Sequence, residues 1–96
     1  MPYIQKKERD ALLDGQVPSN AGQLNYMIHR LIFDYINRSG KCYQTLNDVI
    51  GVLECVKQEL YRRSVAPYED RKIIDNGEVY PDSLLRGSQP PPHGQE

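Results

Sequence analysis

Two adjacent arginines between tyrosines form the group whose chemistry is easiest to interpret. Tyr61, Arg62 and Arg63 stand close to Tyr68. Guanidinium groups bind phosphate through paired hydrogen bonds, and aromatic rings stack on bases. One interpretation is a site for a small phosphorylated ligand, with phosphate on the arginines and a base on a tyrosine. The alternative is that both cations end a helix, where the helix dipole favours them, and pair with the two acids after Tyr68.

A polar face leads up to this group. Asn47, Glu54 and Tyr61 are seven residues apart, so they share one side of a helix, and Gly51 lies beside them. A glycine inside a helix costs about 1 kcal/mol relative to alanine, and it allows close approach of a ligand or backbone. The face is therefore either a binding surface or a solvated face with close helix packing at Gly51.

Acidic residues raise a different possibility, a metal-dependent nucleotide hydrolase. The acids that such an enzyme would use are Glu54, Glu59, Glu69 and Asp70. Magnesium needs carboxylates that face one another, whereas Glu54 and Glu59 are five residues apart and point to different sides of one helix. We keep the hydrolase as an alternative.

The two cysteines do not suggest a metal centre. Cys42 and Cys55 are the only thiols, and His29 and His93 do not stand at zinc-finger spacing. We expect free thiols in a reducing compartment, with no bound metal and no cofactor. A glycine-rich phosphate loop is also absent from the sequence.

The element that carries most of these residues is a predicted helix over residues 43–63. Its apolar stripe has the three-and-four spacing of an amphipathic helix: Leu46, Val49, Ile50, Leu53, Val56 and Leu60. Thr45 and Asp48 resemble a capping box that places an acid in the first turn. Pro67 is expected to end the pattern.

A second long helix is predicted over residues 21–38. Asn20 suits the N-cap, Gln23 completes a capping box, and Ser39 and Gly40 follow the last turn. The main stripe of this helix consists of Leu24, Met27, Ile28, Leu31, Ile32 and Tyr35. Because residues 40–44 form a short connection, we expect an antiparallel hairpin whose two stripes face each other.

Two aromatic residues project almost opposite the main stripe of the 21–38 helix. They are Tyr26 and Phe33, and His29 and Arg30 flank them. Tyrosine and arginine are enriched at interface hot spots, so we predict a subunit or partner interface at these four residues. The alternative is that the chain's own first helix and C-terminal segment cover this face.

Shorter elements complete an all-α domain over residues 1–85. Residues 1–4 look extended. Short helices are predicted at 5–14, before Gly15, and at 67–75, with Asn76 and Gly77 as the stop. Residues 78–85 are expected to form a packed irregular or strand-like segment through Val79, Tyr80 and Leu84. Residues 86–96 contain three consecutive prolines and are expected to form a disordered tail.

The composition limits the partners. The 96 residues carry a net charge of −1, 39% are hydrophobic, and mean hydropathy is −0.67. So little apolar material makes a small core, and self-association would bury more surface. No basic balance indicates extended nucleic acid, and no segment is apolar enough to cross a membrane. We expect a soluble, cytoplasmic protein, in the host cytosol if it is phage-encoded.

Four sequence strings resemble a small uncharacterised domain family associated with phage and prophage genomes. They are M-P-Y-I at the start, L-N-Y at 24–26, Y-Q-T-x-N-D-V-I-G-x-L-E-C at 43–55 and Y-R-R-x-x-A-P-Y-E-D at 61–70. The resemblance spans residues 1–80. It implies no established activity, but small phage accessory proteins are often non-enzymatic binders of host components.

The sequence therefore predicts a non-enzymatic, homo-oligomeric binding protein. It would block a host protein or sequester a small anionic ligand such as a signalling nucleotide. The predicted ligand contacts are Asn47, Tyr61, Arg62, Arg63 and Tyr68. The alternatives are the metal-dependent hydrolase and a structural or scaffolding protein.

Overall fold

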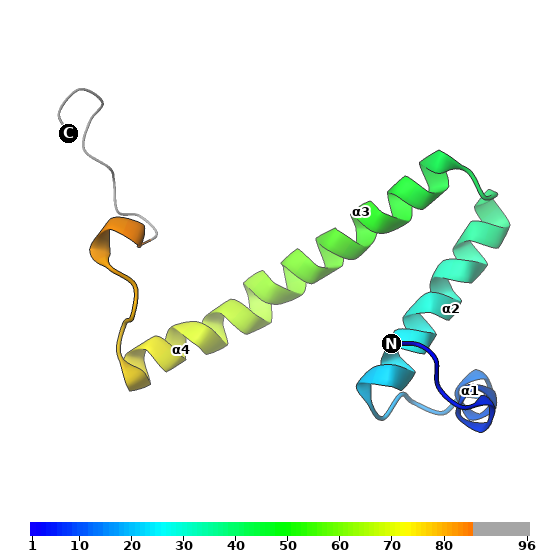
Figure 1. Ribbon diagram of the computed structural model, residues 1–96, viewed down its shortest axis with the longest axis horizontal. Helices are drawn as coiled ribbons and strands as arrows, with labels where there is room; N and C mark the ends of the chain where they lie inside the picture. The colour runs from blue at the N-terminus through cyan, green and yellow to red at the C-terminus, as the bar shows by residue number, and fades with distance from the viewer. Residues whose placement is uncertain (86–96) are drawn as a thin grey trace. The chain divides into compact units, whose positions relative to one another are not determined.

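The computed structural model describes residues 1–85, and every regular element in that part is helical (Figure 1). The all-α prediction is therefore confirmed. The elements are α1 (Lys6–Leu13), α2 (Ala21–Ser39), α3 (Tyr43–Leu60), the π-helix η1 (Tyr61–Val65), α4 (Ala66–Asn76) and the 3₁₀ turn η2 (Asp82–Leu84). The predicted tail at residues 86–96 lies outside the described residues.

Contacts divide the chain into two units, residues 1–55 and 56–96. The first unit holds α1, α2 and most of α3, and the described part of the second holds the end of α3 together with η1, α4 and η2. Because the boundary falls inside α3, no linker separates the units. The assignment of residues 1–85 to one domain stays a prediction.

Helix α1 is fixed at both ends by its own sequence. At the start, the backbone N–H of Gln5 donates to Glu8 Oε2 at 3.0 Å, within a reciprocal capping box. At the end, Gly15 has a φ of 108° and the N–H of Gln16 reaches back to the carbonyl of Ala11 at 3.0 Å. This is a Schellman turn, and it confirms the predicted role of Gly15.

Helix α2 begins as predicted, with one change of partner. Asn20 Oδ1 accepts the N–H of Gln23 at 2.9 Å. The Gln23 side chain, however, accepts from the N–H of Ser19 at 2.9 Å instead of from that of Asn20. Gly40 ends the helix with a φ of 91°, and its N–H donates to Ile36 O at 2.8 Å.

Helix α3 starts two residues earlier than its predicted cap. The helix begins at Tyr43, and the carbonyl of Cys42 accepts the N–H of Leu46 at 3.0 Å. Thr45 is therefore a buried residue of the first turn, and the capping box predicted for Thr45 and Asp48 is wrong. Asp48 lies beyond the first turn, where it accepts a hydrogen bond from Gln44 Nε2 at 2.7 Å.

Pro67 does not end the long helix, contrary to the prediction. Helical residues run from Tyr43 to Asn76 without interruption, a joined helix of 34 residues. The five residues before Ala66 form a π turn, in which the N–H of Ala66 bonds to the carbonyl of Tyr61. Proline lacks an N–H and its ring crowds the carbonyl four residues earlier, so a wider turn at this point lets the helix continue. Gly77 then ends α4, in agreement with the predicted stop.

The apolar stripes of α2 and α3 remain exposed, contrary to the expectation that they would bury each other. Leu31 on α2 is 74% exposed and Ile50 on α3 is 66% exposed. Two helices enclose too little volume to remove large side chains from water, and a small chain with few apolar residues has no further layer to cover them.

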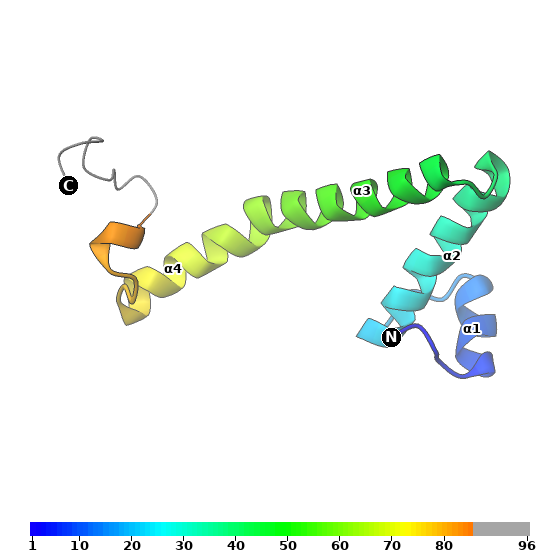
Figure 2. The same ribbon diagram turned by 45° about the horizontal axis from the view of Figure 1, so that its top comes forward.

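The packing that does form joins α1 to the other side of α2, as Figures 1 and 2 both show. Leu12 of α1 is 2% exposed and is the one buried hydrophobic residue in the described part of the chain. The N-terminal segment approaches α2 at Gly22, where an added Cβ would lie 3.2 Å from Ile4 Cγ2. Arg9 Nη1 donates to the carbonyl of Ile4 at 2.8 Å and holds that segment on α1.

The segment after α4 is not packed. Val79, Tyr80 and Leu84 are all mostly exposed, so the expected packing through these residues is wrong. Among residues 78–85 the regular structure is the single turn η2. A single extended segment has no second strand among residues 1–85 with which to pair, so it does not form a sheet.

Candidate functional site

The predicted ligand residues of the second unit lie on η1 and α4, where each is already engaged. The Tyr61 hydroxyl donates a short hydrogen bond to Glu69 Oε1, two helical turns ahead. This bond to a carboxylate stabilises the protonated phenol and raises the pKa of Tyr61 above its usual value of 10.0. Lys72 Nζ lies 5.6 Å from the ring centre of Tyr68, so a cation already occupies one face of that ring.

The two arginines share one carboxylate. Arg62 Nη2 lies 2.9 Å from Glu59 Oε1 and 3.0 Å from Oε2, and Arg63 Nη1 lies 3.6 Å from the same Oε1. The alternative of helix-end cations paired with acids is therefore closer to the observed geometry, although the partner is Glu59 and not the acids after Tyr68. The side chains are more than half exposed, so each pair contributes little to stability.

The remaining ligand candidate, Asn47, belongs to the first unit, whereas the other four belong to the second. Asn47 is exposed on α3. Gly51, the neighbouring glycine, has nothing within 4 Å of an added Cβ. Close packing against another element of residues 1–85 therefore does not explain this glycine.

The predicted interface face of α2 is the side that its own chain partly covers. Tyr26, His29 and Arg30 are half-buried, and Phe33 is 45% exposed. His29 Nδ1 lies 2.9 Å from Asn25 O, which places the proton on Nδ1, and its ring centre is 5.8 Å from that of Phe33. The less exposed residues of α2 thus lie opposite the main stripe. The choice between an interface and cover by the first helix and the C-terminal segment stays open at these four residues.

Sequence reasoning missed a polar network that fastens α1 to α2. Glu8 Oε1 accepts from Gln23 Nε2 at 3.1 Å, while its other oxygen caps α1. Gln23 is 6% exposed and also accepts from Ser19 Oγ at 3.0 Å. The hydrogen bonds lower the pKa of Glu8, with Gln23 as the largest cause. The fifteen-residue separation left no local spacing signal.

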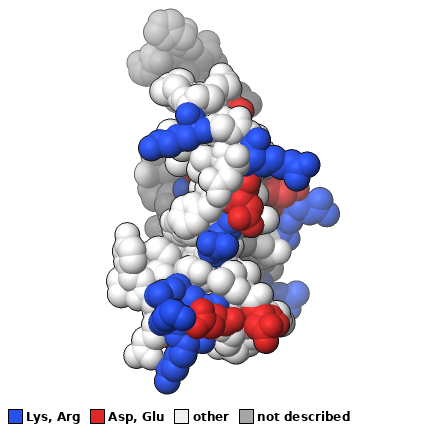
Figure 3. Space-filling view, turned by 90° about the vertical axis from the view of Figure 1, so that its right-hand side faces the viewer, with Lys and Arg blue, Asp and Glu red and all other residues white. Residues whose placement is uncertain are grey.

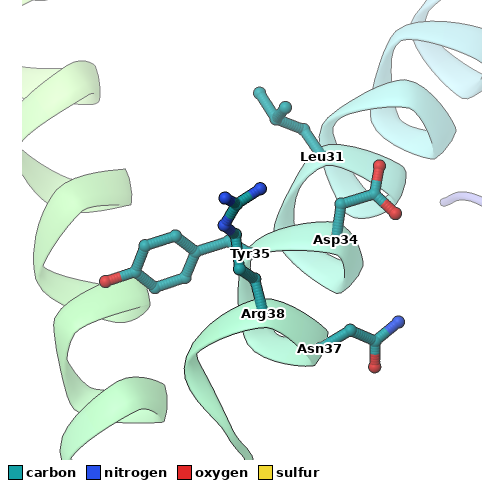
Figure 4. Close-up of a pocket in the computed structure, with 5 residues that line it drawn as sticks. All are labelled: Leu31, Asp34, Tyr35, Asn37 and Arg38. Atoms are coloured by element: carbon teal, nitrogen blue, oxygen red, sulfur yellow. The ribbon is translucent and has the colours of Figure 1, made fainter.

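The exposed stripe of α2 borders a shallow depression, drawn in Figure 4. Its lining consists of Leu31, Asp34, Tyr35, Asn37 and Arg38, all from α2. A depression lined by one helix has walls on one side only, so it fits an elongated apolar partner better than an enclosed small molecule. Its volume is about 570 Å³.

Cys42 is the more activated of the two free, exposed thiols. Its Sγ lies 3.3 Å from Thr45 Oγ1, and hydrogen bonds from the side chain and backbone of Thr45 lower the pKa of Cys42. Within residues 1–85, no three His, Cys, Asp or Glu side chains gather closely enough to hold a metal ion.

Charge is interspersed over the surface drawn in Figure 3, where basic and acidic side chains alternate with uncharged ones. This agrees with the net charge of −1. None of the helices in the described part combines the length and apolarity that a membrane crossing requires.

Comparisons with known proteins give one result. A search of curated proteins and a search of solved structures each found no match. A family model described as "Domain of unknown function (DUF6899)" matches residues 1–79. These residues cover every described helix up to α4 and include all the candidate site residues. The chain therefore belongs to the DUF6899 family of domains of unknown function.

Proposed function

We propose that this protein is a non-enzymatic helical interaction protein that assembles with itself and binds through the surface so formed. The observation that carries the proposal is the exposure of the α2 and α3 stripes, while only one hydrophobic residue of the described part, Leu12, is buried. Apolar stripes of this regularity are costly in water and normally meet another helix. The association with phage genomes suggested by the sequence strings fits a small binder of a host protein.

The subunit surface proposed here differs from the one that the sequence suggested. Tyr26, His29 and Arg30 are half-buried within the chain, whereas Leu31 is exposed on the opposite side of α2. The main stripe is therefore the better candidate for contact with a second chain. Phe33 is 45% exposed and contributes at the margin.

Sequestration of a small anionic ligand has less support from the geometry. Glu59 accepts hydrogen bonds from Arg62 and forms an ion pair with Arg63, so a phosphate would compete with this carboxylate for both arginines. The test is Arg62→Glu. If the arginines bind phosphate, this change abolishes binding of a phosphorylated ligand released from the purified protein, and unchanged binding would exclude the assignment.

The self-association proposal is tested by measuring the mass of the full-length protein by light scattering over a concentration series. We expect a multimer that Leu31→Glu dissociates, because a charge in an apolar interface is not solvated. The matched control is Leu13→Glu, which places the same charge on an exposed leucine of α1. A monomer at every concentration, or equal effects of the two changes, would refute the proposal.

A further inference from the structure

Two exposed stripes of similar length are not covered by any element of residues 1–85. The α2 stripe consists of Leu24, Ile28, Leu31 and Tyr35, and the α3 stripe consists of Leu46, Ile50, Leu53, Val56 and Leu60. Their side chains are between 37% and 74% exposed. At about 1.5 Å per residue the stripes extend over about 17 and 21 Å, so one can lie along the other from end to end.

The exposed area of the stripes reaches, at the upper end of its range, the apolar area that a stable dimer buries. The burial energies of aliphatic side chains correspond to roughly 60–120 Å² of apolar surface each. Nine side chains that are about half exposed then offer roughly 250–550 Å² per copy. A standard interface buries about 800 Å² per partner, of which about 57–65% is apolar, or about 500 Å².

We infer that α2 of one copy packs along α3 of a second copy, while α3 of the first copy packs along α2 of the second. One symmetric dimer then covers both stripes of both chains. This inference rests on the proposed self-association and names the surfaces that meet. Pairing α2 with α2, or α3 with α3, would cover one stripe and leave the other exposed. The exchanged arrangement closes with two copies.

The connection between the helices is short enough to act as a hinge for exchange. Three residues, 40–42, separate α2 from α3. Gly40 has a φ of 91° and a ψ of 137°, a backbone conformation that residues with a Cβ rarely adopt. Short connections held in an unusual conformation are typical of hinges across which an element passes to a partner.

Lengthening the connection tests the inference. A Gly/Ser insert of about six residues between Lys41 and Cys42 removes the fixed direction of the connection, because Gly/Ser segments behave as flexible coils. The longer connection would let α3 fold back on its own α2, so the exchanged dimer becomes a monomer in light scattering. The matched control is the same insert between Gln16 and Val17, which should leave the dimer intact.

Disulfide trapping gives a second, independent test. In a background with Cys42→Ser and Cys55→Ser, chains with Leu31→Cys and chains with Leu53→Cys are mixed and oxidised. These positions lie near the centres of the two stripes, so they meet whichever way the helices run. We expect the mixed disulfide between the two kinds of chain to dominate.

The outcomes separate the inference from the proposed function. A wild-type monomer would overturn both. A wild-type multimer that keeps its mass after the insertion at 41–42 and forms only disulfides between like chains would overturn the exchange and leave self-association in place.

Discussion

Leu12→Ala gives the sharpest test of how α1 is held. Leu12 is 2% exposed, so the change removes apolar volume equivalent to about three methylene groups. At about 0.8 kcal/mol each, the loss is about 2.4 kcal/mol, near the lower end of the range for buried leucines. Since 1.36 kcal/mol corresponds to a factor of ten, the amides of α1 should exchange with solvent about 60-fold faster.

The neighbouring leucine supplies the matched control. Leu13 is on the same helix and is 53% exposed, so Leu13→Ala should cost about half as much or less. Both changes alter helix propensity equally, which isolates the effect of burial. Hydrogen exchange by mass spectrometry, read on peptides of α1 and of α4, gives the result. Equal acceleration of exchange in the two variants would refute the assignment of Leu12 as the residue that fastens α1 to α2.

Three further predictions concern the perturbed groups. The lowered pKa of Glu8 means that its contribution to stability is complete above the unfolded value of about 4.5 and is lost as pH falls through the lower folded value. Amide hydrogen exchange in α1 should therefore accelerate in acid by more than the intrinsic effect of pH in the wild type, but not in Glu8→Gln. Identical pH dependences of amide exchange in the two proteins would contradict this. Cys42 should react with a disulfide reagent faster than Cys55 at neutral pH, which single Cys→Ser variants would show; the reverse order would refute the hydrogen-bonded thiol. In an alkaline absorbance titration, Glu69→Gln should lower the pKa of the Tyr61 phenol, whereas a Tyr61 that titrates identically in the two proteins would exclude the bond.

The sequence predicted the helices well because their signals are local. The end of α1 at Gly15, the N-cap at Asn20 and the stop of α4 at Gly77 depend on backbone geometry within a few residues. The predicted capping box at Thr45 and the predicted helix end at Pro67 were wrong, although they also depend on nearby residues, because at each position two local structures are similarly favourable. At Thr45 the choice lay between adjacent helix starts, and at Pro67 it lay between a break and a π turn.

The candidate site was predicted less well, because each functional group depends on its neighbours in space. The sequence predicted that Arg62 and Arg63 bind phosphate. In the structure both form ion pairs with the carboxylate of Glu59. Tyr61 and Glu69 are eight residues apart across the π turn, whereas neighbouring side chains on an ordinary helix are three or four residues apart.

What the sequence by itself determined is the all-helical class, most of the helix ends and the presence of two apolar stripes, since all of these follow from short-range periodicity and capping. What only the tertiary structure decided is which faces are covered. With α1 packed on α2, Leu12 is buried and Glu8 bonds to Gln23, while Tyr26 of α2 is half-buried and Leu31 is exposed. Burial is set by contacts between residues distant in sequence, and an amphipathic pattern does not specify which chain supplies them.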